Sequence, residues 1–243
     1  MARLIWRTLP WLIVLAIAAA LFLYCRDYVA RHPQDVPWTP LRIDDPIGRF
    51  TLRKLVSLAD DPPQCRALLA AAGSDDDAAP ARIVSADCGY EDGMRLAAAE
   101  GEASFSPAGV VTRCPVAASL VVWERQVLQP AAERHFGRRV TQIHNAGSFS
   151  CRRLYGRSEG RFSEHATANA IDITGFRLAD GTEVSVLRDW GRKGRRTQFL
   201  REVRDGACRL FATTLSPDYN AAHADHLHLD QASRGKSGFG LCS

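Results

Sequence analysis

Two stretches, SEHATANAID at residues 163–172 and HADHLHLD at residues 223–230, decide what kind of domain this chain forms. The ends of both stretches alternate aliphatic with polar residues, which is typical of strands with one buried face. Successive side chains of a strand point to opposite faces of its sheet. Asp172 and His228 therefore leave their predicted strands on the face opposite the aliphatic residues, where the two side chains can meet across the sheet.

The rest of the domain is predicted from the same periodicities. Four short stretches are predicted as strands: residues 140–144, 170–174, 183–186 and 226–230. Residues 114–135 and 197–211 carry apolar side chains three or four positions apart and are predicted as helices with core-facing stripes. Pro130 is expected to kink or end the first helix, and Gly206 costs stability inside the second. These elements predict an α+β domain with a small, mainly antiparallel sheet flanked by helices.

The N-terminus carries an apolar stretch, TLPWLIVLAIAAALFLYC, at residues 8–25. Its length suits a short transmembrane helix, and arginines before it indicate that the N-terminus stays in the cytoplasm. A small-x-small cleavage site exists at Ala18-x-Ala20, but the apolar run continues past it, which favours an uncleaved anchor. Cys25 is disfavoured as a lipoprotein site because bulky residues precede it. Residues 1–25 are therefore predicted as a single-pass inner-membrane anchor.

The chain after the anchor divides into a tether and one domain. Residues 26–47 are polar and contain four prolines, which favour extended backbone, so they are predicted as a tether lying against or leading to the domain. Residues 48–243 are predicted as the domain itself. Within it, the small and acidic residues 71–81 indicate an exposed loop.

Six of the seven cysteines lie beyond the anchor, and an even number in an exported domain indicates disulfides. A cysteine-zinc site is disfavoured because the chain has no CxxC pair. Six cysteines allow 15 pairings that sequence alone does not resolve. One pairing is taken as a working hypothesis: Cys65 with Cys88, Cys114 with Cys151, and Cys208 with Cys242.

The charge of the chain gives little reason to expect nucleic acid as a partner. The formal net charge is +4, and the basic residues are scattered except for the run RKGRR at residues 192–196. Such a run is more often a solvated turn than a nucleic-acid contact. No nucleic-acid partner is therefore expected.

The histidines supply the chemistry of the two opening stretches. His165 lies seven positions before Asp172, and three more histidines, His223, His226 and His228, lie close together in the second stretch. Three imidazole or carboxylate ligands with an open fourth position are what a catalytic zinc requires. A single histidine is usually structural, but this conjunction indicates a metal site.

These residues also resemble a known pattern. Three pairs match the motifs SxH, AxD and HxH of the D-Ala-D-Ala metallopeptidase and Hedgehog fold family: Ser163-x-His165, Ala170-x-Asp172 and His226-x-His228. The segment from about Cys65 to Cys242 is similar to the bacterial extensin-like C-terminal domain family, which belongs to that fold. The resemblance implies that His165, Asp172 and His228 bind Zn²⁺. Ala168 departs from the pattern, because peptidases of this fold often carry glycine there.

The resemblance leaves the acid–base group open. The fold often places a glutamate three residues before the last zinc histidine, where this chain has Asp225. Asp225 would point away from His228 on a regular strand, so it can serve only if the strand begins after it. Other relatives use an HxxHxH pattern, which fits His223, His226 and His228. We expect His226 to stabilise the oxyanion, with Asp225 or His223 assisting proton transfer.

A cationic residue is also expected in the cleft. Residues 148–152, SFSCR, resemble the family's SGYRS segment, whose arginine lies in the cleft. Arg152 is therefore the candidate for binding a substrate carboxylate, although its neighbour Arg153 can be the one turned inward. A guanidinium fork matches a carboxylate with two hydrogen bonds.

Three functions fit these observations to different degrees. The first is a zinc peptidase, carboxypeptidase or endopeptidase, acting on peptidoglycan stem peptides from the periplasmic side of the inner membrane. The second is a non-catalytic envelope binding module that retains the zinc site, as Hedgehog-like relatives do. The third, a metal-free structural spacer, leaves the histidine cluster of residues 223–230 unexplained. Fold resemblance alone does not decide between them.

Overall fold

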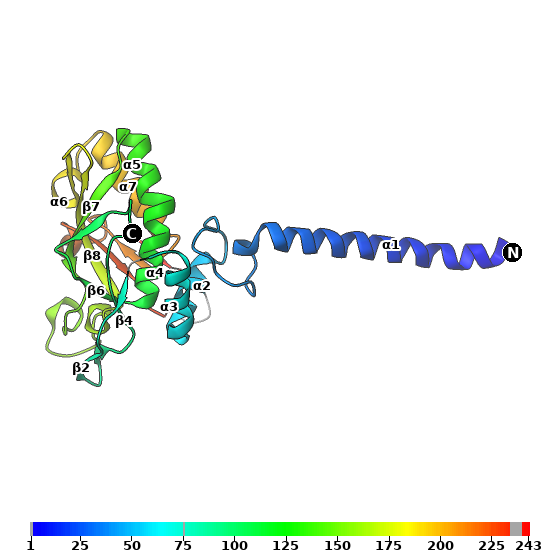
Figure 1. Cartoon of the computed structure of the whole chain (residues 1–243), viewed down its shortest axis with the longest axis horizontal. Helices are drawn as coiled ribbons and strands as arrows, with labels where there is room; N and C mark the ends of the chain where they lie inside the picture. Colours follow the sequence, from blue (N-terminus) through cyan, green and yellow to red (C-terminus); the bar gives the residue numbers. More distant parts are fainter. Residues whose placement is uncertain (1, 75, 234–239) are drawn as a thin grey trace.

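Helix α1 (Ala2–Arg31) projects as a long rod from one side of an α/β domain (Figure 1). The structure is a computed structural model and describes residues 2–74, 76–233 and 240–243. The most apolar 18-residue window within Leu9–Arg31 has a mean hydropathy of 2.0, and none of this window is buried inside the described part of the chain. The helix is therefore long and apolar enough to cross a membrane or to be a signal sequence. It continues six residues beyond the predicted end of the anchor.

The segment predicted as a tether lies against the domain. Val36 and Ile43 are buried, and Lys54 Nζ donates to the carbonyl of Pro33 at 2.8 Å. The side-chain amide of Gln126, in the core helix, donates to the carbonyl oxygen of Ile43 at 2.8 Å. From Pro33 to Ile43 this segment is thus held against the domain by hydrogen bonds and buried side chains.

The remaining helices and the strands alternate along the chain. The α-helices of the domain are α2 (Thr51–Ser57), α3 (Pro62–Ala71), α4 (Cys114–Trp123), α5 (Gln129–Phe136), α6 (Val186–Asp189) and α7 (Arg195–Ala207). Short 3₁₀ helices span Pro33–Asp35, Leu58–Asp60, Leu154–Gly156, Glu164–Thr167 and Ala221–His223, and a π-helical turn spans Glu124–Leu128. The strands are β1 (Asp77–Ala78), β2 (Arg82–Ser85), β3 (Cys88–Tyr90), β4 (Gly93–Arg95), β5 (Ser104–Ser106), β6 (Val111–Arg113), β7 (Val140–Gly147), β8 (Ala170–Leu178), β9 (Glu183–Ser185), β10 (Thr213–Leu215), β11 (Leu227–Asp230) and β12 (Leu241–Cys242).

The main sheet of the described residues contains seven strands in the order β12-β10-β11-β8-β7-β5, with β9 added beside β8. The pairs made by β8 with β7, β9 and β11 are antiparallel, as is β10 with β11, whereas β5 and β12 pair in parallel. All four predicted strands are present as β7, β8, β9 and β11. The mixed α/β character and mainly antiparallel pairing agree with the prediction.

One face of the sheet is covered by a long helix made of α4, the π turn and α5 (Figure 1). Trp123 is fully buried there, and its ring lies 6.0 Å from that of Phe176 on β8. The helix does not end at Pro130. The Gln129 N–H bonds to the Glu124 carbonyl, five residues back, and α5 begins at Gln129. The wider turn absorbs the proline, whose missing N–H is tolerated in a first helical turn.

Helix α7 packs beside this turn. It ends at Ala207, four residues before the predicted end, and Leu210 and Phe211 are buried in the turn that follows. Gly206 has a packing reason, because a Cβ at this position would collide with the side chain of Val127. Glycine lowers the intrinsic stability of the helix, but only a residue without a Cβ lets the two helices approach this closely.

The disulfides correct part of the sequence hypothesis. Cys208–Cys242 is confirmed, but the other two bonds are Cys65–Cys114 and Cys88–Cys151, so the predicted pairs Cys65–Cys88 and Cys114–Cys151 are wrong. Cys65 lies in α3, which packs on α4 where Cys114 begins that helix. Cys88 starts β3, next to the loop that follows β7. Contacts between distant segments, and not spacing along the chain, decide the pairing.

Candidate metal centre

The centre begins with two side chains on paired strands. His228 on β11 lies directly opposite Asp172 on β8 in the antiparallel ladder. Ile171, Ile173, Leu227 and Leu229 of the same strands are fully buried in the core. The alternation predicted from the sequence therefore places Asp172 and His228 together on the other face, and their Oδ1 and Nδ1 atoms are 3.0 Å apart.

His165 reaches the same point from an irregular segment. It lies in the 3₁₀ helix Glu164–Thr167, after Ser163, whose hydroxyl accepts from the His165 N–H. The chain then turns at Ala168, which has a left-handed φ of 54°, and enters β8. Glycine adopts this conformation without a steric cost, which is a physical reason for a glycine at this position. The turn returns the chain to Asp172 within seven residues.

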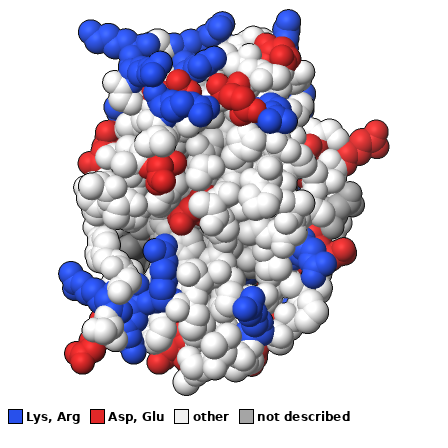
Figure 2. All heavy atoms as spheres, turned by 90° about the vertical axis from the view of Figure 1, so that its left-hand side faces the viewer, with Lys and Arg blue, Asp and Glu red and all other residues white. Residues whose placement is uncertain are grey.

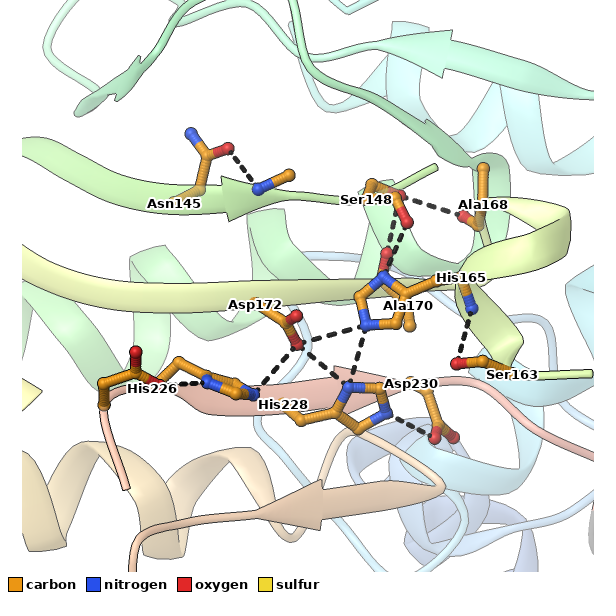
Figure 3. Close-up of polar contacts among 12 residues, drawn as sticks. Asn145, Ser148, Ser163, His165, Ala168, Ala170, Asp172, His226, His228 and Asp230 are labelled. Atoms are coloured by element: carbon orange, nitrogen blue, oxygen red, sulfur yellow. Dashed lines mark hydrogen bonds and ion pairs between the residues drawn. The ribbon is translucent and has the colours of Figure 1, made fainter. Parts of the chain in front are cut away.

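The three side chains form a triangle of donor atoms (Figure 3). His165 Nε2 lies 3.2 Å from Asp172 Oδ1 and 3.1 Å from His228 Nδ1. All three residues are buried. Ligands around a tetrahedral zinc, bonded at about 2.0–2.1 Å, lie about 3.3 Å from each other. The spacing of the three atoms therefore fits one zinc ion.

The outer nitrogen of each histidine is already bound. His165 Nδ1 lies 2.6 Å from the carbonyl oxygen of Ser148, and His228 Nε2 lies 3.0 Å from Asp230 Oδ2. Since both partners are oxygen acceptors, these nitrogens carry protons, and each ring, in its neutral form, directs the lone pair of its other nitrogen inward. Two lone pairs and a carboxylate oxygen facing one point repel each other unless a positive charge lies among them. The donor set thus fits a divalent cation with nitrogen and oxygen ligands.

The electrostatics of the buried groups agree with this picture. Burial opposes the charge of Asp172, but hydrogen bonds from His165 and His228 hold the pKa of its carboxyl well below the usual range. Burial also disfavours the charged form of His228, yet hydrogen bonds to Asp172 and Asp230 raise its pKa to about 9. The pocket therefore stabilises positive charge at the point where the three donor atoms converge.

The other predicted residues lie around this triangle. His226 Nε2 is 3.6 Å from Asp172 Oδ1, and His226 Nδ1 is 2.7 Å from Asp225 Oδ1 (Figure 3). Strand β11 begins at Leu227, after Asp225, so the condition set by the sequence is met. The Asp225 carboxylate, however, is bonded to His226 and lines a neighbouring hollow instead of the cleft over the centre. Asp225 therefore orients His226.

His223 lies in the cleft beside these groups. Its ring centroid is 5.2 Å from that of His226 and 6.0 Å from that of His228. Its Nδ1 donates to Asn220 Oδ1, which leaves Nε2 unprotonated. Burial and electrostatic repulsion from the neighbouring imidazoles of His226 and His228 lower the pKa of His223 to about 4. This imidazole is consequently neutral at pH 7 and able to accept a proton.

The centre opens into a cleft of about 580 Å³. Arg152, Arg153 and Arg161 line one wall, in the loop that Cys151 ties to β3. Arg153 is engaged with the ring of Phe162, 4.3 Å from its centroid, whereas Arg152 is exposed and close enough to lower the pKa of His223. Figure 2 shows basic side chains gathered at the top and at the lower left of this face, the latter beside a hollow.

Sequence reasoning assigned no role to Asp230 or Ser148. Asp230 follows His228 by two positions on the same strand face, and this spacing was a usable signal. The carbonyl of Ser148 left no signal in the sequence, because any residue supplies a backbone carbonyl. Both groups fix the orientation of a histidine.

Comparison with known proteins confirms the extensin-like part of the resemblance. A family model described as extensin-like protein C-terminus matches residues 63–243. No curated protein and no solved structure matches the chain. The matched segment contains every residue of the metal centre and its cleft. The chain belongs, by this domain, to the extensin-like protein C-terminus family.

Proposed function

We propose that the domain is a zinc-dependent peptidase that hydrolyses an amide bond in peptidoglycan peptides. The observation that carries the proposal is the triangle of His165, Asp172 and His228, whose donor atoms lie 3.0–3.2 Å apart at the base of a cleft. The likeness of the three motifs to those of D-Ala-D-Ala metallopeptidases supports the same chemistry. A bound zinc ion supplies a Lewis acid that acidifies water and polarises a carbonyl.

The residues around the triangle have separable roles in this proposal. His226, oriented by the bond from its Nδ1 to Asp225, points its Nε2 toward the centre, and in its doubly protonated form it donates from Nε2 to the oxygen that becomes negative as the amide is attacked. His223 is neutral, and its free Nε2 would accept a proton from the attacking water and pass it to the leaving amine. Arg152 binds a substrate carboxylate at the wall of the cleft.

The N-terminal helix and the disulfides are consistent with a protein that works where peptidoglycan lies. Helix α1 would hold the protein in the inner membrane, with the domain on the periplasmic side where peptidoglycan lies. Three disulfides are expected in an oxidising compartment and are rare in the cytosol. Membrane anchorage would keep the cleft near the inner side of the wall.

Replacing one ligand tests the proposal. The full-length chain in detergent is compared with His165→Ala and with the control His135→Ala, whose histidine contacts Glu202 on the helical side of the domain. We expect about one zinc ion per chain in wild type and control, and loss of both zinc and peptide release in His165→Ala, by at least about a hundredfold. Zinc content is measured by atomic absorption, and released muropeptides by mass spectrometry. Undiminished hydrolysis by His165→Ala would contradict the proposal.

A non-catalytic binding module is the second candidate. It is favoured by Asp225, whose carboxylate is committed to His226 and does not face the centre as a general base. The same experiment separates the two functions. Tight zinc and muropeptide binding by the wild type, without release of any product, would favour the binding module.

A further inference from the structure

The open face of the sheet has a second hollow directly beside the centre. Its volume is about 440 Å³, and Asp225 lines it. His226 lines the main cleft, and the two side chains are bonded at 2.7 Å. The Asp225–His226 pair is therefore the partition between the cleft and the second hollow.

The sheet itself forms the floor of this hollow. Strands β11 and β9 lie end to end along the same edge of β8, with Leu227 opposite Ile173 and Ser185 opposite Gly175. The ladder between β7 and β8 shifts register here, and Thr174 is the extra residue on β8. A β-bulge next to a site re-aims side chains and backbone. The notch between the two strand ends continues the surface that carries Asp172.

The walls of the hollow suit a peptide. Leu187 is 63% exposed and offers an apolar contact. Glu183 is bonded to His144 at 2.9 Å and to Arg177, while Arg188 has no ion pair among the residues that the structure describes. An apolar side chain beside groups of both charges matches a peptide that carries both carboxylate and amino groups.

The dimensions connect the hollow to the reaction. Asp172 and Gly175 are three positions apart on β8, about 10 Å along a strand. An extended peptide covers this distance in about three residues. A substrate that lies across the centre therefore reaches the hollow with a residue two or three positions from the bond that is cut.

We propose that this second hollow, lined by Thr174, Leu187, Arg188 and Asp225, is a peptide-binding subsite, so that the substrate runs through both sides of the centre. The main cleft with Arg152 holds the peptide on one side of the scissile amide, and the hollow holds the other. The preferred substrate is then an internal amide joining two peptide segments, such as a cross-link, and not the bond to a single terminal residue. This inference rests on the proposed function.

The test compares a purified cross-linked muropeptide dimer with its uncross-linked monomer. For the full-length, zinc-loaded chain we expect kcat/KM for the dimer to exceed that for removal of a terminal residue from the monomer by about tenfold or more. Leu187→Asp and Arg188→Glu should bring this ratio close to one. They should also weaken dimer binding to the zinc-free protein about tenfold in calorimetric titration, a readout independent of turnover. Ile83→Asp, in the exposed hairpin β2–β3, is the matched control.

The outcomes separate the two proposals. A zinc protein that trims the monomer as efficiently as it cleaves the dimer, with a ratio insensitive to Leu187→Asp, would overturn the subsite and leave the peptidase standing. A protein that holds no zinc and releases no product from either substrate would overturn the peptidase and, with it, the subsite. Leu187 and Arg188 are both exposed, so folding of the variants is expected to be intact and is verified by circular dichroism.

Discussion

The metal centre joins two regions that are built in different ways. Asp172 and His228 come from β8 and β11, where the antiparallel ladder places them opposite each other. His165 and the arginines of the cleft come from residues 148–168, a segment with little regular structure. In the first region backbone pairing sets the side-chain positions. In the second they depend on individual contacts that vary from one residue to the next.

The irregular region compensates for its missing ladder with specific links. Cys151 is bonded to Cys88, Ser150 N donates to the His165 carbonyl at 2.9 Å, and Asn169 Nδ2 donates to Glu164 Oε2 at 2.7 Å. Each link ties the segment to a neighbour or to itself. Substitutions in this region other than at His165 should therefore change the cleft selectively, whereas those in the ladder should affect metal and fold together.

The largest expected effect concerns the disulfides. Replacing Cys88 and Cys151 by serine should lower the free energy of unfolding by about 2–4 kcal/mol, because the unfolded chain gains freedom. It should also weaken muropeptide binding, since Arg152 adjoins Cys151, while zinc remains bound. Unfolding followed by tryptophan fluorescence, zinc content and calorimetric titration measure the three effects.

The matched pair for this experiment is Cys208 and Cys242, which link the end of α7 to β12. Their replacement should cost a similar free energy of unfolding but leave muropeptide affinity within about twofold of wild type. Equal losses of affinity in both double variants would mean that the loop at Cys151 needs no local tie to shape the cleft.

A smaller effect is expected at Asp230, which fixes the outer nitrogen of His228. Asp230→Ala should weaken zinc binding by about 10–100-fold, because the ring loses the acceptor that sets its tautomer and orientation. Asp230→Asn keeps an oxygen acceptor and should recover much of the affinity. Competition with a chromogenic chelator measures the dissociation constants.

No side-chain substitution in the irregular region corresponds to Asp230→Ala. The partner of His165 is the carbonyl of Ser148, which every residue carries, so Ser148→Ala should leave zinc affinity nearly unchanged as long as the backbone holds its place. An affinity for Asp230→Ala equal to wild type would show that His228 is oriented by the strand alone.

The same contrast explains how much could be predicted from the sequence. The four strands, the two long helices and the meeting of Asp172 with His228 follow from periodicity, which is local. The pairing of Cys65 with Cys114 depends on α3 packing against α4, and the placement of Arg152 depends on the bond between its neighbour Cys151 and Cys88, which are 63 residues apart. No local pattern carries these contacts. The motif resemblance supplied His165, whose segment has no periodicity from which to place it.

Asp225 and Pro130 show a different limit of prediction from the sequence. Asp225 has the chemistry of a base, but its bond to His226 directs it away from the centre, and this geometry depends on where β11 begins. Pro130 was expected to kink or end its helix; the helix does not end there, because a π turn just before the proline leads into α5. Both outcomes depend on one residue of backbone register, which periodicity does not fix.

The smallest expected effect distinguishes strain from packing at Ala168. This residue is fully buried and has a left-handed φ of 54°, so Ala168→Gly relieves about 1 kcal/mol of backbone strain. The substitution also loses a buried methyl group and adds freedom to the unfolded chain, which together cost about 1–2 kcal/mol. Ala166→Gly, two residues earlier and equally buried but without a positive φ, loses the same methyl group with no strain to relieve.

Ala168→Gly should therefore be about 1 kcal/mol more stable than Ala166→Gly in chemical unfolding, with zinc content unchanged in both. The difference between the two variants matters more than either value, because the methyl and entropy contributions cancel between them. If both variants lose the same stability, the turn before β8 holds no strain at Ala168. The glycine that peptidases of the resembled fold often carry at this position would then have to be explained by space for a ligand or backbone near the centre. A difference of the expected size would mean that this chain retains the turn despite a conformational cost, because its hydrogen bonds outweigh the strain in bringing His165 back to Asp172.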